Sequence, residues 1–352
     1  MGPGDTTLDQ VQRLALDGGA PVRKDPFAPW PHFAADEIDA AAAVLRSGKV
    51  NYWTGEQSRE FEREFARFVG VNYAVALSNG TAALELALYA LGIGPGDEVV
   101  VASKTFIASA SCVVRVGAIP VVTDIDPDSQ NITAASIAGV LSARTKAVIA
   151  VHLAGWPCEM DEILALAKER GLRVIEDCAQ SVGARYKGRA TGSIGDIGAF
   201  SFCQDKIITT GGEGGMLVTN ARELWENAWS YKDHGKSYAA VFEREHPLGF
   251  RWLHESFGSN LRITELQSAI GRLQLKKLPQ WLADRRRNAN LLNLGLSTVP
   301  GLRLVSPPAH SEHAYYKYYV FIRPEMLRLG WNLERILDAL NAEGIPCGVG
   351  AC

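Results

Sequence analysis

Short apolar runs alternate with helical patterns over most of the first 220 residues. The apolar runs lie at 73–80, 97–103, 118–125, 146–153 and 172–177, and the helical stretches lie at 34–48, 81–92, 106–117, 133–143 and 159–171. We expect the first helix to end at Gly48. Near-continuous Val and Ile runs separated by helices indicate a parallel sheet with helices on both faces. The sequence therefore predicts an α/β fold with a large, doubly wound, mostly parallel sheet and right-handed crossovers.

The pattern changes after residue 220. Residues 222–260 are aromatic, charged and irregular, which is typical of an excursion near an active site. One long helical stretch covers 263–296, and we expect Pro279 to kink or break it. A strand at 315–322 and a helix at 332–344 complete a smaller α+β domain. The predicted division is an N-terminal arm at 1–30, a large domain at 31–255 and a small C-terminal domain at 256–352.

Charge and composition exclude several classes of protein. The chain has 352 residues, with 36 Lys and Arg against 39 Asp and Glu. It contains no long basic run, so we expect no nucleic-acid partner. No apolar stretch reaches the roughly 20 residues of a membrane helix, and the polar N-terminus lacks a signal-peptide core. The six cysteines include no C-x-x-C pair, which favours reduced thiols. The sequence therefore predicts a cytoplasmic protein without membrane contact.

Polar residues follow the apolar runs, at the end of a parallel sheet where ligands bind. They are Ser78 to Thr81, Ser103 to Phe106, His152, Asp177 with Gln180, and Ser201 with Lys206. A helix begins at Gly80 and Thr81, and its N–H groups and dipole would bind a phosphate. The alternative is ordinary capping of this helix by Ser78 or Asn79.

Two charged residues have two interpretations each. Lys206 is either a surface lysine leaving the core or an amine nucleophile for a carbonyl group. Asp177 and Glu176 are adjacent, but side chains alternate along a strand, so these carboxylates cannot act as a pair. A single carboxylate in apolar surroundings needs a cation, which is either a protonated pyridine nitrogen or a structural salt-bridge partner.

Other catalytic motifs are missing from the sequence. It contains no H-E-x-x-H, no G-x-S-x-G and no GKS/T phosphate loop. His152 and Cys158 lack the spacing of metal ligands. We therefore predict no metal site.

Several motifs occur in one characteristic order along the chain. They are NGTAALELAL, TFIASA, VHLAGWPCEMDEI, VIEDCAQSVGARYKG, GDIGAFSF, Lys206 with TTGGEGGM, DHG, and GSNLRITELQSAIGRLQL. In this order they resemble the DegT/StrS-type sugar aminotransferases, from about residue 30 to the end of the chain. The resemblance implies pyridoxal 5′-phosphate as cofactor and the aspartate aminotransferase fold, known as fold type I.

The resemblance assigns roles to the matching residues. Lys206 would bind the cofactor covalently, and Asp177 would keep its pyridine nitrogen protonated. The other cofactor residues would be Gly80, Thr81 and Ser201 at the phosphate, Gln180 near the phenolic oxygen, and Phe106 stacked on the ring. Asn260 would reach the phosphate from the neighbouring subunit, which implies a homodimer with shared active sites.

The resemblance also implies the reaction. An amino acid, with L-glutamate as the expected donor, would give up its amino group while Lys206 acts as general base and acid. Some relatives carry histidine at this position and dehydrate their substrate, so Lys206 favours amino transfer. The expected acceptor is a nucleotide-linked keto-sugar, for lipopolysaccharide or other polysaccharide, or for natural-product biosynthesis. A cyclitol of the scyllo-inosose type is the alternative acceptor.

Four further residues are candidates for binding the acceptor: Tyr52, Trp53, His234 and Arg262. Tyr52 and Trp53 stand where the family's substrate loop tends to be, but packing at an interface explains them equally well. Arg262 would bind the sugar or a diphosphate, or would form an ion pair within the dimer.

The chain ends earlier than the family pattern does. The family usually continues for a few dozen residues beyond a segment such as EGIPCGVGAC, with which this chain ends. We therefore expect a small domain without its last elements, and a stronger effect on activity than on cofactor binding. A non-catalytic, cofactor-binding regulatory relative is a further alternative, against which Lys206, Asp177, Gln180 and Ser201 argue.

Overall fold

The computed structural model describes residues 13–350, which form two compact units. The larger unit comprises Pro31–Leu291 and Val305–Tyr318, and the smaller unit comprises residues 13–30, Leu292–Leu304 and 319–350. This division differs from the predicted boundary at residue 256, because residues 256–291 belong to the larger unit. In this segment Leu275, Leu278 and Leu282 are part of the larger unit's hydrophobic core.

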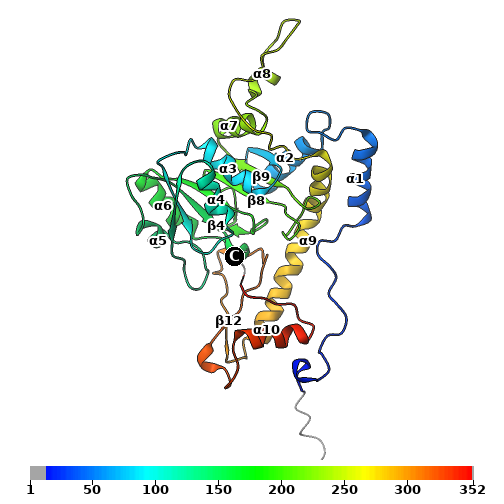
Figure 1. The fold of residues 1–352 in the computed structure, drawn as a ribbon, viewed down its shortest axis with the longest axis vertical. Coiled ribbons are helices and arrows are strands. Elements are labelled where there is room, and N and C mark those ends of the chain that lie inside the picture. The colour runs from blue at the N-terminus through cyan, green and yellow to red at the C-terminus, as the bar shows by residue number, and fades with distance from the viewer. Residues whose placement is uncertain (1–12, 351–352) are drawn as a thin grey trace, which may run out of the picture. The chain divides into compact units, whose positions relative to one another are not determined.

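The larger unit is built on a seven-stranded, mostly parallel sheet (Figure 1). In spatial order its strands are β1 (Tyr73–Leu77), β9 (Gly215–Thr219), β8 (Ile197–Ser201), β5 (Arg173–Asp177), β4 (Thr145–Val151), β2 (Glu98–Ala102) and β3 (Ile119–Thr123). Strands β8, β5, β4, β2 and β3 pair in parallel, and β9 pairs antiparallel with β8 and β1. Every residue of β2, β8 and β9 is buried. The predicted α/β fold class is confirmed.

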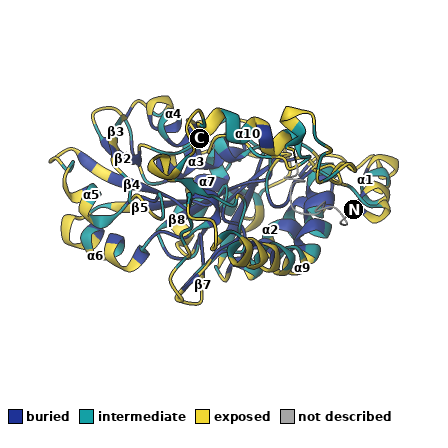
Figure 2. Cartoon of the chain, turned by 90° about the horizontal axis from the view of Figure 1, so that it is seen from below, coloured by how far each residue is buried: buried dark blue, intermediate teal, exposed yellow. Residues whose placement is uncertain are grey.

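Helices connect most of the strands. They are α1 (Ala35–Ser47), α2 (Gln57–Val69), α3 (Gly80–Ala90), α4 (Ala108–Arg115), α5 (Ala134–Ala138), α6 (Met160–Arg170), α7 (Arg222–Lys232), α8 (Tyr238–Phe242) and α9 (Glu265–Leu296). Several of them, among them α2, α3, α4, α6 and α7, pack on the sheet. Figure 2 shows α3 and α4 on one side of the sheet and α5 and α6 on the other, with buried residues concentrated along the strands. The apolar helix faces therefore bury the sheet from both sides, as the strand pattern predicts.

The ends of two helices test local sequence signals. Helix α1 ends at Gly48 as predicted, where a φ of +65° puts the residue in the left-handed region. Helix α9 runs through Pro279 for 32 residues, so the chain does not break there. Leu275 and Leu278 before the proline and Leu282 after it lie in one core, which holds both halves of the helix. No helix within residues 13–350 is long and apolar enough to cross a bilayer.

A second, three-stranded sheet of the larger unit holds the segment 305–318. It joins β11 (Ser311–Glu312), β6 (Arg185–Tyr186) and β7 (Arg189–Ala190). The strand predicted at 315–322 is confined to β12 (Phe321–Ile322); Tyr315 has a φ of +50° and the chain bends at Tyr316 and Lys317, so the start of the segment is not extended.

The smaller unit is an α+β structure. Its elements are η1 (Ala15–Asp17), β10 (Leu302–Arg303), β12, η3 (Pro324–Met326) and α10 (Leu333–Ala342). Glu343 accepts hydrogen bonds of 2.8 Å from the N–H groups of Ala15 and Val22. Arg335 of α10 forms an ion pair with Asp17 at 3.2 Å. Residues 13–30 of the segment predicted as an N-terminal arm therefore pack against the helix α10 and the residue that follows it.

Candidate active site

The predicted phosphate site lies where β1 leads into α3. Asn79 caps the helix, since its Oδ1 accepts the N–H of Ala82 at 2.8 Å. This cap satisfies the N–H of Ala82. The remaining N–H groups of the first helical turn have no hydrogen-bond acceptor inside the helix, as at the start of any α-helix. A Cβ on Gly80 would lie only 2.6 Å from the Cβ of Ser201, at the end of β8. The missing side chain therefore lets Ser201 lie close against the first turn of α3, which carries Thr81.

Asp177 ends β5 at the same edge of the sheet, and its side chain is buried. Its Oδ2 accepts a hydrogen bond of 2.7 Å from Ser109 Oγ, and its Oδ1 accepts the N–H of Ala179 at 3.1 Å. Burial raises the pKa of Asp177, and these hydrogen bonds offset that effect only in part. A cation placed at this carboxylate would favour its ionised form.

Lys206 follows β8 and is not directed into solvent, since its side chain is 16% exposed. Its Nζ lies 3.3 Å from Oδ2 of Asp205 and 3.5 Å from Oη of Tyr316. Its positive charge also offsets a part of the rise that burial causes in the pKa of Asp177. The structure thus brings the amine and the buried carboxylate of Asp177 into one electrostatic environment.

Gln180 lies just beyond β5 and supports a neighbouring turn. Its Oε1 accepts the N–H of Ala154 at 2.6 Å, in the 3-10 helix η2 (Leu153–Gly155) that follows β4. Ala154 has a φ of +57°, which is uncommon for a residue with a side chain. Gln180 therefore holds a strained turn at the edge of the sheet where Asp177 lies.

Phe106 lies in the turn between β2 and α4, and the residue is 62% exposed. Its carbonyl accepts the N–H of Ser109 at 3.1 Å, and Thr105 Oγ1 and Ser109 Oγ are hydrogen-bonded at 2.7 Å. The turn therefore presents an aromatic side chain, and the first residues of α4 present the hydroxyl that binds Asp177.

Tyr52 and Trp53 pack within the chain. Tyr52 is 3% exposed, its hydroxyl donates to Glu62 at 3.2 Å, and it accepts from Trp229 Nε1 at 3.3 Å. The ammonium of Lys232 lies 3.7 Å from the centre of the Tyr52 ring. Trp53 is half-buried, edge-on to Tyr52 and Trp229. These contacts explain Tyr52 as a packing residue, and its hydroxyl already has hydrogen-bond partners within the chain.

Arg262 and its neighbours lie on two paired segments. Arg262 Nη1 donates to Oδ1 of the buried Asp233 at 2.6 Å, so its ion pair forms within one chain. Asp233 pairs with Asn260 through an isolated β-bridge. Asn260 and His234 are exposed, and His234 has a φ of +61°. Asn260 and His234 are therefore accessible to groups outside the chain.

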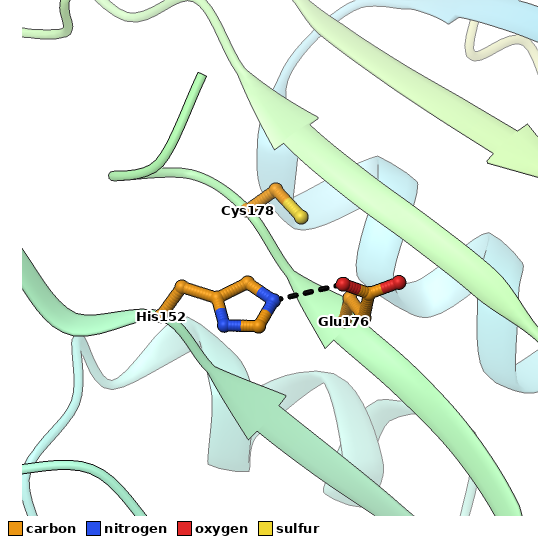
Figure 3. Close-up of side chains that lie close together, drawn as sticks. All are labelled: His152, Glu176 and Cys178. Carbon is orange, nitrogen blue, oxygen red and sulfur yellow. Dashed lines mark hydrogen bonds and ion pairs between the residues drawn. The ribbon is translucent and has the colours of Figure 1, made fainter. Parts of the chain in front are cut away.

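A second buried group lies on the other face of β5. Figure 3 shows His152, Glu176 and Cys178, whose potential ligand atoms lie within 4.8 Å of one another. His152 Nδ1 accepts the N–H of Cys158 at 3.0 Å, so its proton is on Nε2, which donates to Glu176 at 2.9 Å. Both imidazole nitrogens are therefore already committed to hydrogen bonds within the chain.

The Glu176 carboxylate is committed as well. It accepts the backbone N–H groups of Gly192, Ile194 and Gly195 at 2.8, 2.7 and 2.7 Å. Burial would raise the pKa of Glu176, but the hydrogen bonds from His152 and the backbone outweigh it and lower this pKa. Glu176 thus anchors the turn after β7, while Asp177 faces the opposite side, as strand alternation predicts.

Sequence reasoning missed Ser109, Asp205 and Tyr316. Ser109 follows Phe106 within the motif TFIASA, so its position offered a signal. Asp205 precedes Lys206 directly, where a carboxylate has no distinctive pattern. Tyr316 lies 110 residues beyond Lys206, so only the fold brings the two together.

Comparison with known proteins agrees with this geometry. The sequence profile of the DegT/DnrJ/EryC1/StrS aminotransferase family matches residues 31–350. The L-glutamine:2-deoxy-scyllo-inosose aminotransferase of Streptoalloteichus tenebrarius is 38% identical over 95% of this chain and 80% of its own. The GDP-perosamine synthase of Caulobacter vibrioides is 41% identical over 82% of this chain and 75% of its own. An aminotransferase from Psychrobacter cryohalolentis, known from its X-ray structure, is 54% identical with a TM-score of 0.89, over 92% of this chain and 84% of that one.

Fold and site together define an aminotransferase of fold type I. The chain belongs to the DegT/DnrJ/EryC1/StrS aminotransferase family.

Proposed function

We propose that this chain is a pyridoxal-phosphate-dependent aminotransferase that moves an amino group from an amino acid to a keto-sugar. The observation that supports it most directly is the buried Asp177 carboxylate, on which the charge of Lys206 acts. When bound, the cofactor supplies an electron-withdrawing ring that acidifies the α-carbon of the donor and carries the amino group between substrates.

The residues present fit this cofactor. Gly80, Thr81 and Ser201 would bind the phosphate, since the Ser201 side chain lies close to the first turn of α3, whose N–H groups favour an anion. The carboxylate of Asp177 would receive the protonated pyridine nitrogen, which supplies the cation that a buried carboxylate needs.

The remaining groups would complete the site. Phe106 would cover the ring with its exposed aromatic face, and Gln180 would lie near the phenolic oxygen. Lys206 would bind the cofactor covalently at rest and would take and return a proton at Nζ during transfer. These groups argue against a non-catalytic relative, since a regulatory protein has no need of an amine placed for proton transfer.

The acceptor that we propose is a nucleotide-linked keto-sugar, for polysaccharide or natural-product biosynthesis. The 41% identity to a GDP-perosamine synthase supports it. The 38% identity over 95% of the chain to a scyllo-inosose aminotransferase favours a cyclitol as the second candidate. That relative uses L-glutamine by name, so the donor is L-glutamate or L-glutamine.

Spectroscopy tests the function in stages. Purified chain is mixed with pyridoxal phosphate, and its visible spectrum is recorded before and after L-glutamate or L-glutamine. We expect a cofactor band that one donor converts to the spectrum of pyridoxamine phosphate, and that a keto-sugar or keto-cyclitol then restores. A band that no amino acid changes would contradict the transfer function.

We further propose a homodimer with shared active sites, located in the cytoplasm. The exposed Asn260 and the exposed apolar side chains of Leu248, Phe250 and Trp252 support an interface beside this segment. The five described cysteines are free thiols, which suits a reducing compartment.

A mixture of two inactive variants tests the sharing of sites. Lys206→Ala and Asn260→Ala are each expected to be poorly active alone. If Asn260 serves the partner's site, a mixed dimer contains one site with both native residues, so mixing restores activity. Mixing without recovery, although mixed dimers form, would contradict shared sites.

A further inference from the structure

The Lys206 amine has two polar neighbours that its expected role does not use. Oδ2 of Asp205 lies 3.3 Å from Nζ, and Oη of Tyr316 lies 3.5 Å from it. Tyr316 Oη also donates a hydrogen bond to the same oxygen of Asp205. The three groups therefore form a closed triangle at the atom that would carry the proton.

The backbone around Tyr316 is held firmly. The N–H groups of Ala314 and Lys317 donate to the carbonyls of Gly155 and Ala154 in η2, at 2.9 and 3.3 Å. The Tyr316 ring is partly buried against the core of the larger unit. The hydroxyl is thus presented by a segment anchored on both sides.

Strain also marks this segment. Tyr315 has a φ of +50°, its ring stacks on His313 at 4.0 Å between centroids, and its carbonyl accepts from Arg285 at 3.0 Å. Such a backbone conformation persists only where the surroundings over-determine it, and it is found most often at functional sites. Here it sets the direction of the next residue, Tyr316.

One turn supports both sides of the site. The carbonyl of Ala154 in η2 accepts the N–H of Lys317, and the N–H of Ala154 donates to Oε1 of Gln180 at 2.6 Å. The support of Tyr316 is therefore continuous with that of Gln180, a residue expected at the cofactor.

We propose that Asp205 and Tyr316 are positioning residues that together hold the Lys206 amine and its proton. The Asp205 carboxylate stabilises the ammonium form of Lys206 by its charge. Tyr316 Oη accepts a hydrogen bond of 3.5 Å from Lys206 Nζ while it donates to the same carboxylate oxygen, and Nζ lies 5.1 Å from the centre of the Tyr316 ring, so the tyrosine also stabilises the ammonium. This inference rests on the proposed function, in which Lys206 gives and takes a proton at Nζ.

The charge balance within the triangle agrees with this arrangement. Burial would raise the pKa of Asp205, but the hydrogen bond from Tyr316 and the charge of Lys206 outweigh it, so this pKa is lowered. Asp205 is therefore ionised near neutral pH, as the proposal requires.

Amine labelling of the full chain tests the proposal independently of amino transfer. The rate at which an acylating reagent modifies Lys206 is measured by mass spectrometry against pH, without cofactor and with pyridoxamine phosphate. The exposed Lys168 of the same molecule is the reference. The variants are Asp205→Asn and Tyr316→Phe. Tyr186→Phe is the matched control, since Tyr186 also donates to a carboxylate, that of Glu159, at 3.2 Å.

Both variants are expected to change the labelling rate in the same direction, because each removes a group that stabilises the ammonium. Near neutral pH, Asp205→Asn should label Lys206 about two- to fivefold faster, as for partly exposed ion pairs, and Tyr316→Phe should also label it faster. The pH profile of kcat/KM should shift toward lower pH in both variants, and the control should match the wild type. Labelling that is no faster than in the wild type, in either variant, would overturn the proposal. If the wild type transfers no amino group, the proposed function fails, but the labelling rates still decide this inference.

Discussion

Ser109 donates a hydrogen bond of 2.7 Å to the buried carboxylate of Asp177, from a helix 68 residues earlier in the chain. The turn that carries Phe106 also hydrogen-bonds to Ser109. Ser109 therefore links the aromatic and the acidic side of the proposed cofactor site, through its N–H to Phe106 and its hydroxyl to Asp177. Because the hydrogen bond from the hydroxyl affects the pKa of Asp177, a substitution of Ser109 can test the ionisation of the carboxylate.

Replacing Ser109 by alanine should make cofactor binding more sensitive to acid. The hydrogen bond from Ser109 lowers the pKa of Asp177, which burial raises, so the variant raises this pKa further. Binding that needs the ionised carboxylate is then lost at a higher pH as the pH falls. We expect affinity for pyridoxal phosphate to drop about tenfold at the acidic end, the value of one charged hydrogen bond. Titration by absorbance across pH measures it.

The matched control is Ser111→Ala on the same helix, where the hydroxyl donates only to the carbonyl of Ala108 at 3.5 Å. Its pH profile should overlay that of the wild type. Overlaid profiles for Ser109→Ala would contradict the role given to Ser109.

Removing the Lys206 amine should abolish transfer and leave the fold intact. Lys206→Ala should lower kcat by about a hundred- to ten-thousandfold, the usual contribution of general acid–base catalysis. Single-turnover conversion of the bound cofactor by the donor amino acid measures it. Lys206→Arg should be equally impaired, since it keeps the charge but not a readily deprotonated amine. Wild-type turnover in either variant would refute the assignment.

A side chain at residue 80 should damage both stability and phosphate binding. Gly80→Ala places a Cβ 2.6 Å from that of Ser201, so we expect the free energy of unfolding to fall by about 1–3 kcal/mol through overpacking. Added pyridoxal phosphate should also raise the unfolding temperature less than in the wild type. Thermal unfolding with and without cofactor measures both effects.

Gly295→Ala provides the comparison, because no atom lies within 4 Å of the Cβ it would add. It should leave stability unchanged or slightly higher, as is usual for glycine replaced in a helix. If Gly80→Ala behaved in the same way, the close approach to Ser201 would be disproved.

The buried cluster on the far face of β5 should act through stability. Glu176→Gln replaces a carboxylate that accepts from three backbone N–H groups and His152, so we expect a loss of about 3–5 kcal/mol. The pKa of Glu176 is lower in the folded protein than in the unfolded chain. Its ionised carboxylate therefore stabilises the fold at pH values above the pKa of the unfolded chain, and this contribution is lost as the pH falls through the pKa of the folded protein. The difference between wild type and variant should therefore shrink in acid.

Chemical denaturation at several pH values, with the exposed Glu162→Gln as control, measures this effect. A chelator should not change the stability of the wild type, because the imidazole and carboxylate atoms already have partners. A large destabilisation by chelator would instead show that the cluster holds a metal ion.

Much of the fold could be predicted from local patterns. Apolar runs and helical spacing predict β1, β2, β4, β5 and the helices between them, because the period of the apolar positions depends on the local geometry of a strand or helix. The positions of Gly80, Asp177 and Lys206 follow from the same patterns, because ligands bind at the carboxyl ends of parallel strands. Two expectations differ from the structure: Pro279 does not break α9, and the strand expected at 315–322 is limited to Phe321–Ile322.

The sequence by itself thus determined the architecture, the family and the main chemical groups, because these depend on short-range periodicity and on motifs. Only the tertiary structure decided which partners those groups have. Ser109 reaches Asp177 across 68 residues and Tyr316 reaches Lys206 across 110, while Tyr52 is sealed against Glu62 and Lys232. Contacts of this kind arise when distant segments are packed together, and no local pattern of residues encodes them.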